Sequence, residues 1–179
     1  MTLTPDLRED IVAAIPPLRA FAISLSGNVD AADDLVQETI LRGLSHLDSF
    51  QPGTNLQAWL FTILRNQFHT SFRKRRREVE DPEGGYAARL GSLPEQGGHL
   101  DLEDLKMALT KLPFEQREAL LLVGAQGFSY EESAEICGTR IGTIKSRVNR
   151  ARTRLAELLS VEDAEDIGAD RVLKAALQQ

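Results

Sequence analysis

Apolar residues recur every three to four positions along most of the 179-residue chain, and no stretch alternates in the manner of a β-strand. This periodicity predicts an all-α protein. The first predicted helix, 7–15, should end at Pro16-Pro17, because proline lacks the amide hydrogen and its ring clashes with the preceding turn. Further helices are expected over 18–26, from the N-cap Asp30 to Leu47, from Leu56 into a basic run at 73–77, over 100–112, over 115–124 and, as a pair, over 129–155.

Turn-forming residues gather in the middle of the chain. Residues 79–98 contain two prolines and five glycines. This composition is typical of a flexible linker, and about twenty structureless residues are unusual inside one compact domain. We therefore predict two small helical domains, at 1–77 and 100–160, joined by a linker at 78–99 and followed by a C-terminal tail at 161–179.

The pair of short helices at 129–155 has the spacing of a helix-turn-helix. Counting Tyr130 as the first position, Ala134 is fifth, Gly138 ninth and Ile144 fifteenth. A small residue lets the two helices approach, glycine accepts a left-handed turn, and a branched apolar residue locks the second helix onto the first. This spacing favours DNA binding, although a short helix pair with a merely solvated basic face is the alternative.

The total charge has to be read by segment. A net charge of −6 argues against a nucleic-acid binder, but the charges are segregated. Residues 73–77 form an unbroken basic run, whereas acidic residues gather at 78–83 and 157–170. Because local cation density decides phosphate binding, the negative total does not exclude DNA as a partner.

Several functional classes have little support. The single cysteine, Cys137, cannot form an intramolecular disulfide or a thiolate cluster, and its apolar position predicts a small buried hydrophobe. The three histidines lack metal-ligand spacing, so no metal or cofactor is expected. No catalytic constellation stands out, and neither an enzyme nor a small-molecule substrate is expected. With no apolar run of about 20 residues and no leader, we expect a cytoplasmic protein.

Cations line the second helix of the pair. We expect Thr139 to cap this helix and bring its first turn to the major groove. The side chains placed to face base edges are Lys145, Ser146, Asn149 and Arg150. Those expected on phosphates or in solvent are Arg147, Arg152 and Arg154.

Two other polar groups admit two interpretations. The basic run at 73–77 is either a solvated helix end or a phosphate site, and the aromatic side chains near it suit unstacked bases. These aromatics are Trp59, which we assign to the core, Phe61, Phe68 and Phe72, interleaved with Arg65, Asn66 and His69. The polar face of the helix from Asp30 carries Asp34, Gln37, Glu38 and Arg42, and by default it is solvated.

Taken together, the motifs resemble a bacterial RNA polymerase sigma factor of the extracytoplasmic-function group. The similarity runs from about residue 18 to residue 159. Its motifs are DLVQET at 34–39, the segment 50–66, LPFEQRE at 112–118 and GTIKSRVNRAR at 142–152. The chain looks most like the alphaproteobacterial general-stress-response branch. Ser133 departs from the family, which usually has an apolar residue there.

The resemblance implies a role for each motif. The face with Asp34, Gln37, Glu38 and Arg42 would dock on core RNA polymerase. The −10 promoter element would be bound by Phe50, Thr54, Asn55, Asn66, Arg73, Lys74, Arg75 and Arg76. The −35 element would be bound by Arg140, Thr143, Lys145, Ser146, Arg147, Asn149 and Arg150. A small anti-sigma protein is an implied further partner.

Two other functions stay open at the level of the sequence. A sigma mimic would bind the anti-sigma protein without initiating transcription, although a mimic has no need of the cations on the second helix. An ordinary helix-turn-helix regulator would bind duplex DNA without polymerase.

Overall fold

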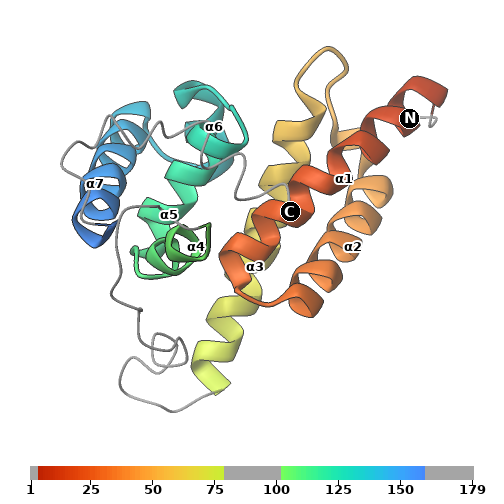
Figure 1. Ribbon diagram of the computed structural model, residues 1–179. Coiled ribbons are helices and arrows are strands. Elements are labelled where there is room, and N and C mark those ends of the chain that lie inside the picture. The colour runs from red at the N-terminus through yellow and green to blue at the C-terminus, as the bar shows by residue number, and fades with distance from the viewer. Residues whose placement is uncertain (1–3, 79–101, 160–179) are drawn as a thin grey trace.

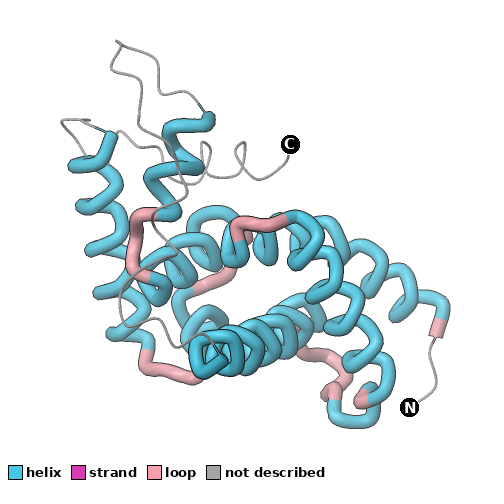
Figure 2. Tube along the Cα trace, turned by 90° about the horizontal axis from the view of Figure 1, so that it is seen from below, coloured by secondary structure: helices cyan, strands magenta, loops and turns pink. Residues whose placement is uncertain are grey.

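The computed structural model describes residues 4–78 and 102–159, apart from the side chains of 72–78, 102 and 103. Every regular element in these ranges is helical, which confirms the all-α prediction (Figures 1 and 2). The elements are α1 (Pro5–Ser26), α2 (Val29–Ser45), the 3-10 turn η1 (Leu47–Ser49), α3 (Leu56–Glu78), α4 (Leu102–Thr110), α5 (Phe114–Leu120), the π-helical turn η2 (Leu121–Ala125), α6 (Tyr130–Cys137) and α7 (Ile141–Leu159).

Helix α1 continues through Pro16 and Pro17, so the predicted break at these residues is wrong. The two prolines leave the carbonyl groups of Val12 and Ala13 without their usual helical donors. Both Val12 and Ala13 are exposed, and water can therefore solvate these carbonyls. Buried side chains precede and follow the proline pair on one face, so packing holds the helix together across it.

The start of α2 also differs from its prediction. Asn28, rather than Asp30, is the N-cap: its side chain accepts a hydrogen bond from the Ala31 amide at 2.9 Å. Asn28 has extended backbone angles, as an N-cap requires, and follows Gly27, whose φ of 67° ends α1. Asp30 lies in the first turn, where its charge complements the helix dipole.

The spacing of the helix-turn-helix is confirmed. Ala134 and Ile144 are buried, and Gly138 has a φ of 60° between α6 and α7. A capping box starts α6, in which the Ser129 and Glu132 side chains each bond the other's backbone amide. The capping prediction for Thr139 is wrong, because α7 begins only at Ile141 and the Thr139 amide donates to the Ala134 carbonyl at 2.9 Å.

The helices form two blocks that touch. Helices α1–α3 lie together on one side of the molecule and α4–α7 on the other (Figure 1). Across the boundary α3 packs against α6, and α1 packs against α4 and α5. The predicted linker at 78–99 and the tail at 161–179 lie outside the described residues, except for the last residue of α3.

Candidate nucleic-acid and polymerase interfaces

The second helix of the helix-turn-helix, α7, separates its core residues from its predicted base readers. Its buried side chains are Ile144, Val148, Ala151 and Leu155. Their spacing of three and four residues forms a stripe, and α7 packs against α5 and α6. Lys145, Ser146, Asn149 and Arg150 of α7 are exposed, as is Arg140 directly before the helix, while Thr143 and Arg147 are half-buried. The structure therefore gathers the predicted base readers on the outward face of α7.

The Lys145 side chain contacts an aromatic ring of the neighbouring helix α6. Its Nζ lies 5.8 Å from the centre of the Tyr130 ring, which is the first residue of α6. A cation over an aromatic face is attracted by the ring quadrupole. This contact restricts the long Lys145 side chain and links the reading helix to its partner helix.

The loop at 50–55 is anchored at both ends. Phe50 is 7% exposed, and its ring lies 5.4 Å from that of Trp59. Phe50 thus supports the loop from the core instead of presenting its ring to DNA. Gly53 has a φ of 89°, and the Thr54 hydroxyl donates to the Gln51 carbonyl at 2.7 Å. Thr54 itself is exposed at the loop tip.

Asn55 uses both ends of its side-chain amide. Its oxygen accepts a hydrogen bond from the Ala58 amide at 3.2 Å, which caps α3. Its nitrogen donates to Glu132 Oε1 at 2.7 Å, across the boundary to α6. Asn66, further along α3, is exposed. The side chains of Arg73, Lys74, Arg75 and Arg76 lie outside the described residues.

The predicted polymerase-docking residues share one exposed face of α2. Asp34, Gln37, Glu38 and Arg42 are all exposed, opposite the buried Ala32, Leu35, Val36, Thr39 and Gly43. The face also carries two apolar side chains that helical periodicity groups with the core residues of this helix but that are not buried: Leu41 is 58% exposed and Leu44 41%. Leu41 lies three residues after Glu38 and seven after Asp34, which places it in the middle of the polar stripe. That spacing was the available signal.

A buried carboxylate lies at the boundary between the two blocks. Glu118 of α5 is 0% exposed, and its Oε1 accepts a hydrogen bond from Arg65 Nε at 2.7 Å. His69 Nε2 lies 3.5 Å from the same oxygen, and the Cys137 thiol donates to Oε2 at 3.6 Å. Sequence patterns did not indicate this cluster.

Burial and neighbouring groups shift the pKa values of two members of this cluster, Glu118 and Cys137. Burial alone would raise the pKa of the Glu118 carboxyl, but His69 and Arg65 beside it hold that pKa below its usual value. Burial, together with the Glu118 charge, raises the pKa of the Cys137 thiol to about 12. Cys137 is therefore the small buried residue that its apolar position predicted, and its thiolate is strongly disfavoured.

Aromatic rings surround the cluster. Phe68 of α3 stacks on Phe114 of α5, with ring centres 5.4 Å apart and planes 8° apart. The Phe114 ring also meets His69 edge-on at 4.9 Å. Phe61 is fully buried between Phe21 and Phe128, at 5.1 and 5.0 Å. Phe61 is thus a core residue, and Phe68 lies in the contact between the blocks instead of offering a free face to bases.

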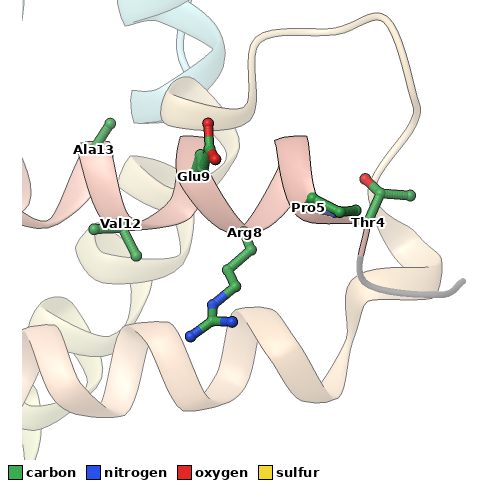
Figure 3. Close-up of a pocket in the computed structure, with 6 residues that line it drawn as sticks. All are labelled: Thr4, Pro5, Arg8, Glu9, Val12 and Ala13. Carbon is green, nitrogen blue, oxygen red and sulfur yellow. The ribbon is translucent and has the colours of Figure 1, made fainter.

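A shallow hollow of about 650 Å³ lies at the N-terminal end of α1 (Figure 3). Its lining residues are Thr4, Pro5, Arg8, Glu9, Val12 and Ala13. Arg8 and Glu9 point to opposite sides of the helix (Figure 3). All the lining comes from one helix and its cap, so the polar groups do not converge on a ligand position.

Comparison with known proteins identifies these two blocks. Residues 11–78 match the family described as Sigma-70 region 2, and residues 102–155 match Sigma-70, region 4. The ECF RNA polymerase sigma factor EcfG of Rhodopseudomonas palustris is 64% identical over 177 residues, which cover 99% of this chain and 98% of that protein. The chain belongs to the extracytoplasmic-function family of RNA polymerase sigma factors. Members of this family are transcription initiation factors and not enzymes.

Solved structures agree with this assignment. The sigma factor RpoE of Bartonella quintana, solved in complex with the anti-sigma factor NepR, is 54% identical and superposes with a TM-score of 0.77, covering 89% of this chain and all of that one. CnrH, solved with the cytosolic domain of CnrY, is 25% identical with a TM-score of 0.60 and 88% coverage of both chains. Over the described residues, no helix is both long and apolar enough to cross a lipid bilayer.

Proposed function

We propose that this chain directs core RNA polymerase to its promoters by dividing recognition between the two blocks. The α2 face docks on the polymerase, the loop at 50–55 binds the −10 element as the duplex opens, and α7 reads the −35 element in the major groove. The observation that carries the proposal is the outward face of α7, where Lys145, Ser146, Asn149 and Arg150 are exposed together. Lysine and arginine suit guanine edges, and asparagine suits adenine.

The composition of the α2 face supports its role in docking. Charged residues there surround the exposed Leu41, and Leu44 lies beside them. An apolar centre with a polar rim is the usual anatomy of a protein interface. Docking would bury Leu41, which has no core to pack against in this structure, and the surrounding charges would set orientation.

Control by a small anti-sigma protein belongs to the same proposal. The support is the similarity to EcfG and to the RpoE that was solved with NepR. We infer that such a protein holds this chain in the cytoplasm until a general stress signal releases it, after which the chain joins the polymerase at the nucleoid. Because the charges are segregated, the basic residues of α7 and α3 can bind DNA despite the negative net charge. The affinity for DNA should fall steeply as the salt concentration rises.

Transcription in vitro tests the division of roles. The full chain is mixed with core polymerase and a promoter of a stress gene, and initiation and core binding are measured separately. Arg150→Ala should cost about 1–3 kcal/mol of discrimination at the −35 element and leave core binding intact. Asp34→Lys with Glu38→Lys should weaken core binding itself, because both charges on the docking face are reversed.

Arg154→Ala is the matched control on the same helix. Arg154 lies one turn beyond Arg150, towards the C-terminal end of α7, and pairs with Glu157 at 2.9 Å, so its loss should change −35 selectivity little. Equal loss of promoter selectivity and core binding in Arg150→Ala would refute the division of roles. A chain that binds an anti-sigma protein but initiates at no promoter would be a sigma mimic, and tight protection of an operator without polymerase would indicate an ordinary regulator.

A further inference from the structure

The closed arrangement of the two blocks cannot contact both promoter elements at once. Asn55, in the loop proposed for the −10 element, is hydrogen-bonded to Glu132 of the helix-turn-helix. The −10 and −35 elements are separated by about 25 base pairs, or roughly 85 Å of duplex at 3.4 Å per base pair. The blocks must therefore separate before the chain can span a promoter. This step rests on the proposed function, since it takes the two blocks as readers of different elements.

The contacts across the boundary differ in kind. Ring contacts such as Phe68–Phe114 and Phe61–Phe128 bury apolar surface and tolerate small changes of geometry. The contact between Arg65 and Glu118 is a charged hydrogen bond with one partner fully buried. A buried charge is tolerated only while it is paired, so this contact decides whether the closed arrangement is stable.

The pairing of Glu118 comes almost entirely from the other block. Its cationic neighbour Arg65 and the imidazole of His69 both lie on α3, whereas the Cys137 thiol is its hydrogen-bond donor from the α4–α7 block. When the blocks separate, water can reach the carboxylate and replace α3. When they are closed, the carboxylate depends on Arg65 of α3 as its direct ion-pair partner. Loss of Arg65 therefore penalises the closed arrangement and leaves the separated one nearly unaffected.

We propose that Glu118, Arg65 and His69 form a latch that keeps the free chain closed and inactive. In the closed chain the Asn55 amide is bonded to Glu132 and is withheld from DNA. Opening the latch releases the loop at 50–55 and frees the two blocks to reach their separate elements. The chain thus carries its own restraint, independent of any second protein.

Small-angle scattering and DNA binding on the full chain test the latch. Arg65→Ala should shift the closed–open equilibrium about tenfold or more toward the open form, because Glu118 loses its arginine and keeps only His69 and the Cys137 thiol beside it. The radius of gyration should rise clearly above the value of about 16 Å expected for a compact chain of this length. Binding of a fluorescent single-stranded oligonucleotide with the −10 sequence of the transcribed promoter should strengthen in parallel.

The double variant Arg65→Ala/Glu118→Gln separates the latch from general damage. It removes the unpaired charge while the ring contacts stay, so the chain should close again and bind the oligonucleotide as the unmodified chain does. Arg65→Glu, which sets a second carboxylate against Glu118, should open the chain at least as far as Arg65→Ala and serves where that variant does not fold. Circular dichroism checks that each variant keeps its helices.

Arg19→Ala is the matched control. Arg19 and Asp33 form a two-contact ion pair at 2.6 and 3.2 Å within the α1–α3 block, on the surface. Its loss should leave the radius of gyration unchanged. An unchanged radius in both folded Arg65 variants would overturn the latch. Opening without stronger oligonucleotide binding would keep the latch and reject the loop at 50–55 as the −10 reader.

Discussion

Ser133 is a buried polar residue on α6. The residue is 0% exposed, and its Oγ has no hydrogen-bond partner among the described residues. A buried polar atom without a partner costs its full desolvation energy. Ser133 is thus buried at the position where the resemblance to the family leads us to expect an apolar residue, and an apolar side chain there would avoid this cost.

Ser133→Ala should stabilise the chain. It removes the unpaired hydroxyl and keeps nearly the same volume, so the free energy of unfolding should rise by about 1 kcal/mol. Urea unfolding followed by circular dichroism measures the change. Ser129→Ala is the matched control of opposite sign: it deletes the N-cap of α6 and should cost about 1 kcal/mol. A destabilised Ser133→Ala would mean that the hydroxyl is satisfied in solution.

At the scale of elements, local rules predicted the turns better than the helix ends. The position of Gly138 in the helix-turn-helix followed from spacing alone, because a left-handed residue there has few alternatives to glycine. The break at Pro16-Pro17 failed because tertiary packing overrode a local cost. Asn28 caps α2 in place of the predicted Asp30, because aspartate and asparagine both suit an N-cap and only the backbone angles show which residue holds it.

Two glycines near the turn should respond in opposite directions to alanine. Gly138→Ala forces an L-residue into the left-handed region at a φ of 60° and should cost about 1–2 kcal/mol. Gly142 lies inside α7, and a Cβ there would meet nothing within 4 Å. Gly142→Ala should therefore raise the free energy of unfolding, by at most about 1 kcal/mol. Thermal unfolding of the two variants measures both signs. Equal effects would contradict the turn geometry.

At the scale of the whole molecule, the sequence indicated two helical blocks but not how they meet. Glu118 lies in a motif whose pattern does not distinguish a solvated glutamate from a buried one. Its burial depends on Arg65, which is 53 positions away along the chain. The same limit applies to Leu41, since periodicity grouped apolar residues together and could not say which of them lacked a core. Contacts between distant segments are the information that local patterns do not contain.

The ion pair at the boundary predicts a dependence on pH. The pKa of Glu118 in the folded chain lies below its ordinary value of about 4.3, so its charge stabilises the fold above that value. This contribution is lost as the pH falls through the lowered pKa. The melting temperature should therefore fall more between pH 6 and pH 3 in the unmodified chain than in Glu118→Gln. Parallel profiles would show that Glu118 is not charged in the folded state.

The two carboxylate oxygens of Glu132 accept hydrogen bonds from different partners. Oε2 accepts the Ser129 amide at 2.9 Å and completes the cap of α6, while Oε1 receives Asn55 at 2.7 Å. When Asn55 departs, water can occupy Oε1 and the cap on Oε2 is untouched. The module that reads DNA is thus already shaped before it is released, and no refolding step should delay the search for a promoter.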